Sequence, residues 1–141
     1  MEIEAVKENK GGKSPHFNGM EVGRQFFEYF YKTWSTDPDA LARDCVVRPY
    51  SKMQYNSTVF EGENFIMLLK QFAYTGLEIT NCKYEIFDTG SRQIHILVNG
   101  MMRCNMIGTD TKHFSQFILI VYMGEKAEHK WALQSSILNI M

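Results

Sequence analysis

The chain of 141 residues has few of the residues that build disulfides and metal centres. Its three cysteines, Cys45, Cys82 and Cys104, are scattered and odd in number, and no two have the spacing of metal ligands or of a redox pair. No two of the 4 histidines have metal-ligand spacing either. We therefore expect three reduced thiols in or near a core, and neither a metal nor another cofactor.

The chain also lacks an excess of charge and a long apolar run. Lys and Arg number 15 and Asp and Glu number 16, so the formal net charge is -1. This balance provides no positive field to hold a phosphate backbone and disfavours strong, direct nucleic-acid binding. No secretory apolar region opens the chain, and no run is long enough to cross a bilayer. We expect a soluble, intracellular protein without a membrane partner.

What the chain does contain is enough apolar material for one domain. Hydrophobic residues make up 45% of the sequence, which is sufficient for a core in a chain of this length. Residues 1–19 differ from the rest because they are charged, contain a Gly-Gly pair and have few apolar residues. The sequence therefore predicts a flexible arm over 1–19 and a folded domain over 20–141.

Three segments have the apolar spacing of helices, and they cover residues 20–34, 39–44 and 63–72. In the first, apolar residues at intervals of three and four define one broad face: Val22, Phe26, Phe27, Phe30, Tyr31 and Trp34. Asp37 followed by Pro38 is typical of the capped start of the second.

The remaining segments are typical of strands. Short β-type stretches fall at 46–55 and 59–62, and long ones at 77–88, 93–103, 113–122 and 130–139. Helices followed by four long strands indicate an α+β fold, in which helices pack on one face of a bent antiparallel sheet. The strand HFSQFILIVY at 113–122 hardly alternates polar with apolar residues, so we expect both of its faces to be covered.

Four motifs in the same order resemble those of the nuclear transport factor 2 family. Val22 to Tyr31 (VGRQFFEYFY) resembles its first helix, Phe60-Glu61-Gly62 its step before the third helix, and Phe114 to Leu119 (FSQFIL) its Phe-x-Gln strand, while Trp131 matches the start of its last strand. The resemblance covers about Met20 to the C-terminus. It implies a cone, in which a curved antiparallel sheet wraps about three helices, the nuclear transport factor 2-like or cystatin-like α+β roll.

Members of this family commonly dimerise sheet against sheet, which would explain a strand covered on both faces. On this basis we expect a partner interface on the outer face of the sheet. Its predicted members are Phe114, Gln116 and Ile118 on the apolar strand, with Arg103 and Gln134 as polar partners on adjacent strands. These faces follow from alternation alone, and a shift of one residue would reverse them.

Within the family, the chain resembles most the small subunit of the heterodimeric mRNA export receptor. Both have an aromatic-Asn pair, here Tyr55-Asn56 at the expected mouth of the cavity, and a similar apolar strand. The resemblance implies a non-enzymatic transport factor, present in the nucleus, at the nuclear pore and in the cytoplasm. It would pair with the related domain of a large mRNA export receptor and help it engage the phenylalanine-glycine repeats of nucleoporins.

The alternative within the family is the homodimeric carrier that imports Ran-GDP. That carrier uses acidic residues around its cavity mouth, where this chain has the neutral Asn56 and, in the loop 105–111, only Asp110. Carboxylates at those positions pair with cations of the GTPase, so their absence disfavours this role. The N-terminal module of stress-granule and Ras-GAP-binding proteins also begins its first helix with Val-Gly-Arg, but it would make this chain an excised domain.

Isomerases and dehydratases with the same cone are a distant third possibility. They need an Asp or His base deep in the cavity, beside an electrophilic Tyr or Asp. His95 lies between Ile94 and Ile96 and is predicted to be a partly exposed histidine of the sheet, while Asp44 is predicted to end the short helix. We therefore expect that the protein is not an enzyme.

Overall fold

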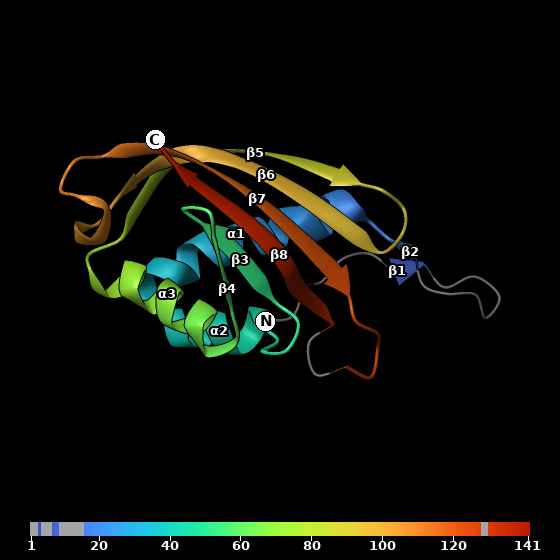
Figure 1. Ribbon diagram of the computed structural model, residues 1–141. Helices are drawn as coiled ribbons and strands as arrows, with labels where there is room; N and C mark the ends of the chain where they lie inside the picture. Colours follow the sequence, from blue (N-terminus) through green and yellow to red (C-terminus); the bar gives the residue numbers. More distant parts are fainter. Residues whose placement is uncertain (1–2, 4–6, 9–15, 128–129) are drawn as a thin grey trace.

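A computed structural model describes residues 3, 7–8, 16–127 and 130–141 (Figure 1). Its helices are α1 (Gly19–Thr36), α2 (Pro38–Cys45) and α3 (Gly62–Tyr74), with a short 3-10 turn η1 (Asn105–Ile107). The strands are β1 (Lys7–Glu8), β2 (His16–Phe17), β3 (Lys52–Tyr55), β4 (Thr58–Glu61), β5 (Glu78–Asp88), β6 (Gln93–Arg103), β7 (Lys112–Tyr122) and β8 (Trp131–Ile140). The predicted helices and long strands are confirmed, each within two residues of its expected bounds.

The larger of the two sheets has six strands in the order β4-β3-β8-β7-β6-β5. It curves over the three helices, which all lie on its concave side (Figure 1). This arrangement confirms the predicted α+β cone. One pairing differs from the expectation, because β3 and β8 run parallel while the other neighbours are antiparallel.

The helices begin and pack as their sequences indicate. The side chain of Asn18 accepts a hydrogen bond from the backbone N–H of Glu21 and caps α1. Asp37 caps α2 in the same way, with Pro38 at the first turn, as predicted. Gly23 brings α1 close to β5, because a Cβ at this position would lie only 2.8 Å from Cγ2 of Ile86.

Aromatic side chains fill the space between the sheet and the helices. The ring of Trp34 packs against Phe30 and Phe72, with centroids 5.6 and 5.5 Å apart, and its indole N–H donates to the carbonyl of Leu69 at 2.9 Å. Each of the largest core side chains is at most 1% exposed: Phe26, Phe30, Trp34, Phe65, Phe72 and Phe114. Burial of each such ring stabilises the fold by about 1.5–3 kcal/mol. The concave side of the cone is therefore a packed core.

The N-terminal arm predicted over 1–19 falls mostly on residues outside those that the structure describes. The part that is described pairs β1 with β2 in a small antiparallel sheet, and α1 begins at Gly19. Among the described residues, no helix is both long and apolar enough to span a membrane.

Candidate interface on the outer face of the sheet

Strand β7 has two faces of different character, because successive side chains of a strand point to opposite sides. Phe114, Gln116 and Ile118 are at most 1% exposed and face the helices. The residues between them are half-buried and face outward: Ser115, Phe117, Leu119 and Val121. The prediction that placed Phe114, Gln116 and Ile118 on the outer face is therefore wrong by one residue.

The error has a physical reason in the partners of Gln116. The hydroxyl of Tyr31 donates to its Oε1 at 2.6 Å, and its Nε2 donates to the hydroxyl of Ser136 at 2.9 Å. A buried amide is stable when its polar atoms are paired, and α1 and β8 supply those pairs inside the same chain. Because Tyr31 is 85 residues away in sequence, the local pattern of β7 could not show that a polar residue belongs to the core.

The outward residues of β5 to β8 form an apolar surface that we call the outer patch. Its members are Phe87, Leu97, Phe117, Leu119, Val121 and Ile137. Phe117 lies at its centre, directly opposite Leu97 on β6 and Ile137 on β8. Phe87 is 50% exposed and Ile137 is 39% exposed, so apolar area of this surface faces solvent.

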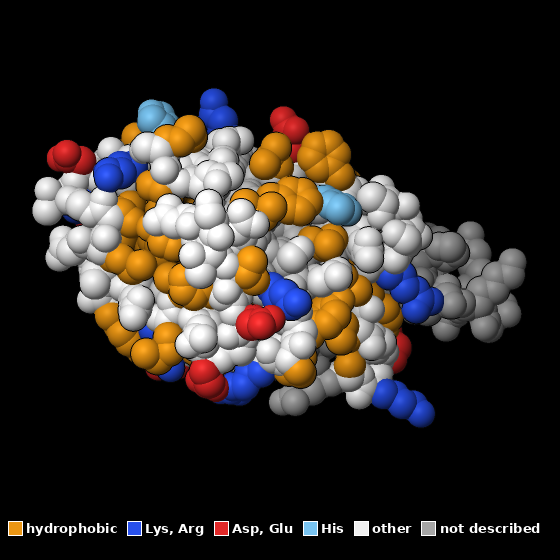
Figure 2. All heavy atoms as spheres, in the orientation of Figure 1, with side chains coloured by type: hydrophobic (Ala, Val, Ile, Leu, Met, Phe, Trp, Pro, Cys, Tyr) orange, Lys and Arg blue, Asp and Glu red, His pale blue; other side chains and the backbone are white. Residues whose placement is uncertain are grey.

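Charged and polar side chains border and interrupt the outer patch. Figure 2 shows hydrophobic side chains gathered in several groups over the sheet, with charged side chains between them. Glu85 lies opposite Leu97 at one side. Lys52 and Glu61 pair across β3 and β4, with 3.6 Å between the amine and the carboxylate. An apolar centre with a charged border is the usual composition of a protein–protein interface.

His95 belongs to this outer surface. It lies opposite Leu119 on β7 and Phe87 on β5, and its ring centroid is 5.4 Å from that of Phe117. The side chain is half-buried, which agrees with the prediction of a partly exposed histidine in the sheet. Since His95 faces away from the helices, it does not point into the concave side of the cone.

The two predicted polar partners lie in different settings. Arg103 is exposed at the end of β6, on the outer side, and donates to the carboxylate of Glu78 at 2.7 Å. Gln134 is the extra residue of a β-bulge, because Leu119 pairs with Ser135 while the next residue of β7 pairs with Leu133. Its Oε1 is buried and has no hydrogen-bond partner among the described residues. An acceptor left in this state costs about 1–3 kcal/mol.

The predicted cavity-mouth residues lie at the turn between β3 and β4. Tyr55 is half-buried, and its ring meets Phe72 of α3 edge-on at 5.3 Å. Asn56 and Ser57 are exposed, with φ values of 51° and 64°. Two successive residues of positive φ are typical of a tight hairpin turn, in which asparagine is favoured. Tyr55 thus packs on the core, whereas Asn56 shapes the turn.

One pair of acid–base groups was not predicted from the sequence. The hydroxyl of Tyr29 on α1 donates to the carboxylate of Asp44 on α2. Burial and the neighbouring carboxylate raise the pKa of Tyr29. Burial also raises the pKa of Asp44, but the hydrogen bond from Tyr29 and nearby positive charge outweigh it, so the pKa lies below its ordinary value. Such a carboxylate is a weak base and is poorly suited to general acid–base chemistry at neutral pH.

Comparison with known proteins establishes the fold. No protein-family model matches the sequence, and the search of curated proteins finds no relative. Nuclear transport factor 2 from Cryptosporidium parvum is similar, with a TM-score of 0.67 and 19% identity over 86% of this chain and 94% of that chain. The yeast Ubp3-associated protein Bre5 has a TM-score of 0.66 and 15% identity over 89% and 98% of the two chains. A structure of the yeast deubiquitinase Ubp3 with its Bre5 cofactor matches as well.

A third neighbour comes from a different functional class. It is a putative dehydratase of the nuclear transport factor 2-like family from Streptomyces avermitilis, with a TM-score of 0.68 and 8% identity over 84% and 92% of the chains. All these identities are low, so the likeness shows the fold alone. The chain is an α+β protein with the nuclear transport factor 2-like fold, which transport factors, cofactors of other proteins and dehydratases have in common.

Proposed function

We propose that this protein is a non-enzymatic pairing subunit whose outer patch packs against a second domain of the same fold. In the preferred form of the proposal, that domain belongs to a large mRNA export receptor. The heterodimer would engage the phenylalanine-glycine repeats of nucleoporins and pass between the nucleus, the nuclear pore and the cytoplasm. The protein would contribute no direct, strong contact with nucleic acid.

The outer patch is the observation that carries this proposal. Its central row joins Ile137, Phe117 and Leu97 across three adjacent strands of the sheet. A partner that covers this row would remove apolar area from water, which stabilises a complex by about 25 cal/mol for each Å² buried. The likeness to Bre5, which forms a complex with Ubp3, supports a role in partner binding.

The alternative is a homodimeric carrier of Ran-GDP, and the likeness to a nuclear transport factor 2 supports it. A homodimer would use the same outer patch on both chains. The exposed Asn56 at the β3–β4 turn carries no charge for a cationic partner, which disfavours this alternative.

An isomerase or dehydratase is the third possibility, and the likeness to the Streptomyces protein supports it. The packing of the cone disfavours it. Aromatic rings occupy the concave side, Asp44 has a lowered pKa, and His95 faces outward. Catalysis by this fold would require a base that faces a substrate inside the cone.

Affinity purification of the tagged full chain from its source cells, at moderate salt, tests the proposal. Wild type is compared with Phe117→Arg, which puts a cation at the centre of the outer patch. Met20→Arg is the matched control, because Met20 is a large apolar residue of α1 that is 57% exposed and lies outside the patch. Both variants are first checked for a cooperative thermal unfolding transition.

A large export receptor that carries its own domain of this fold, recovered with wild type and Met20→Arg but not with Phe117→Arg, would support the preferred form. Recovery of Ran in its GDP form with a homodimer would replace it with the carrier. A monomer that retains no partner and converts a small molecule would overturn both forms.

A further inference from the structure

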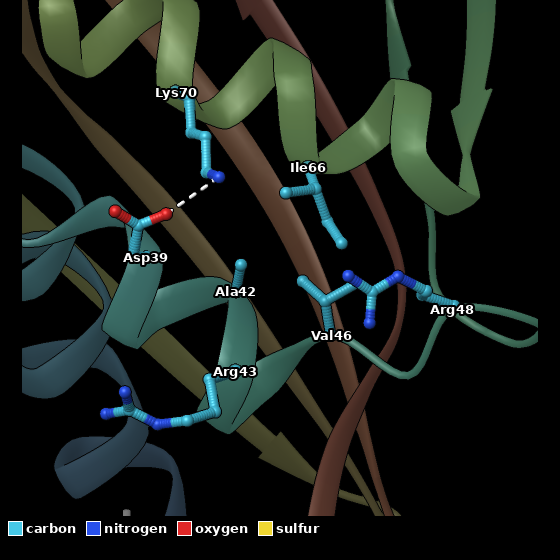
Figure 3. A pocket seen from close by; sticks show the side chains of 7 residues that line it. All are labelled: Asp39, Ala42, Arg43, Val46, Arg48, Ile66 and Lys70. Carbon is cyan, nitrogen blue, oxygen red and sulfur yellow. Dashed lines mark ion pairs between the residues drawn. The ribbon is translucent and has the colours of Figure 1, made fainter.

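A pocket of about 340 Å³ lies between α2 and α3 in the helical layer, away from the outer patch. Figure 3 shows its lining side chains, which come from both helices and from the segment after α2. Three of its lining residues are apolar, Ala42, Val46 and Ile66, and four are charged, Asp39, Arg43, Arg48 and Lys70. Three cations and one carboxylate therefore line the same pocket.

Nearby carboxylates pair with these cations but do not use all of the hydrogen-bond donors of the cations. Lys70 donates to Asp39 across the pocket at 2.7 Å. Arg48 contacts Glu63 through its Nε, and no other ion pair or hydrogen bond of Arg48 occurs within the described part of the chain. The Arg48 side chain extends toward Val46, with its guanidinium beside that side chain (Figure 3), and Arg48 is one of the residues that line the pocket.

Arg43 contributes less directly than Arg48. Its guanidinium points away from the other cations, toward the edge of the pocket (Figure 3). Its Nε is 3.5 Å from the carboxylate of Asp44, so Arg43 and Arg48 each have one ion pair and differ in the direction of their guanidinium groups. Arg48 is thus the cation best placed to receive an anionic group from outside.

Exposed apolar side chains continue the pocket along α3. Met67 is 52% exposed and Tyr74 is 67% exposed. Glu63, Met67, Lys70 and Tyr74 are spaced by four, three and four residues along α3. This spacing places all four on one face of the helix. The hydroxyl of Tyr74 is 3.4 Å from Asp39, which joins this face to the rim of the pocket.

We propose that the pocket and this face of α3 bind a short acidic segment of a partner protein. A carboxylate of the segment would accept hydrogen bonds from the terminal nitrogens of Arg48, because the planar guanidinium matches the two oxygens of a carboxylate. A neighbouring apolar side chain of the segment would lie on Met67 and Tyr74. These exposed apolar groups favour a peptide over a free inorganic anion, which has no apolar part to contact them.

This site goes beyond pairing through the sheet. The helices and the outer patch lie on opposite sides of the sheet, so one partner at each surface is sterically compatible (Figure 1). The acidic segment would come from a second partner or from a different part of the same one.

A peptide array tests the site with the full chain as the probe. The array presents eight-residue peptides that combine Asp or Glu with Leu, Phe or Met, each beside a twin with Asn or Gln in place of the acids. We expect retention on acidic peptides and not on their amide twins. A retained peptide is then titrated by fluorescence anisotropy, where Arg48→Gln should weaken binding about 2- to 5-fold, the loss expected for a solvent-exposed ion pair, because the Arg48 side chain is 65% exposed.

Two further variants separate this site from general electrostatics. Arg24→Gln is the charge-matched control, because it removes an arginine of α1 that pairs with Glu21 and Glu28. It should leave peptide binding unchanged. The double variant Arg48→Glu/Glu63→Arg keeps an ion pair but reverses the charge beside the pocket, so it should lose the acidic peptides. Thermal unfolding of each variant confirms that it is folded.

Retention of no peptide, or equal retention by wild type and Arg48→Gln, would overturn the proposal. Binding of inorganic phosphate without any peptide retained would assign the pocket to a small anion instead. The result is independent of the sheet interface, because Phe117→Arg should bind the peptides as wild type does. Conversely, Arg48→Gln should keep the partner of the outer patch.

Discussion

The chain of hydrogen bonds through Gln116 makes a sharp prediction about stability. Tyr31 donates to Gln116, and Gln116 donates to Ser136, while all three side chains are buried. Gln116→Met keeps most of the side-chain volume but removes both hydrogen bonds. It leaves the hydroxyls of Tyr31 and Ser136 in the core without a partner.

The magnitude follows from the number of polar groups that are left unpaired. One unpaired buried group costs about 1–3 kcal/mol, so Tyr31→Phe, which strands only Oε1 of Gln116, should lower the free energy of unfolding by that amount. Gln116→Met strands two hydroxyls and should cost about 2–5 kcal/mol. The triple variant Tyr31→Phe/Gln116→Met/Ser136→Ala strands none of these groups, and we expect it to be more stable than Gln116→Met alone.

Urea unfolding, followed by the fluorescence of the buried Trp34 and Trp131, measures these differences. With a slope of about 1–3 kcal/mol per molar urea, a loss of 2 kcal/mol, taken from the range of about 1–3 kcal/mol above, moves the midpoint by roughly 1 M. The decisive comparison is between Gln116→Met and the triple variant. If the triple variant unfolds at a lower urea concentration than Gln116→Met, the hydrogen bonds of Gln116 do not explain its burial.

Three further predictions concern the surface, the packing and the charges. The free energy of unfolding of Phe117→Arg should lie within about 1 kcal/mol of the wild-type value, since Phe117 is half-exposed. In sedimentation velocity, this variant should no longer form the complex with the partner that binds the outer patch. A variant that is unfolded at room temperature would contradict the outer position of Phe117. Gly23→Val should cost about 1–3 kcal/mol in urea unfolding, because its side chain would overlap Ile86; wild-type stability would show that α1 can move aside. The pKa of Glu21 is lowered to about 2 by the hydrogen bond from Arg24, so its stabilisation is present above the ordinary pKa of 4.5 and is lost as the pH falls toward 2. Glu21→Gln should therefore flatten the dependence of unfolding temperature on pH in that window, and an unchanged slope would refute the pairing.

Most of the fold could be predicted because each element carries its own local pattern. The apolar spacing in residues 20–34 predicts α1, and Asp37-Pro38 predicts the start of α2. The predicted range 93–103 agrees with β6. Helical and strand periods depend on neighbours a few residues apart, so a single sequence contains them. The parallel pairing of β3 with β8 joins segments about 80 residues apart, and no local pattern reports it.

The candidate sites divide in the same way. The sequence alone predicted that both faces of β7 are covered, but not which face meets the helices, because a nearly continuous apolar run has no dominant alternation. The missing information was the partner of one polar residue, Gln116. The pocket between α2 and α3 was not predicted at all, since Lys70 and Asp39 meet only when the helices pack.

The sequence alone determined where the helices and the long strands begin and end, because caps, turns and apolar periods act over a few residues. Only the tertiary structure decided that Phe117 faces outward while Gln116 is buried, because Tyr31 and Ser136 reach that amide from distant segments. It also decided that Arg48 lines one pocket with residues of α2 and α3. Both choices depend on long-range packing, in which the direction of a side chain is set by what the rest of the chain brings to it.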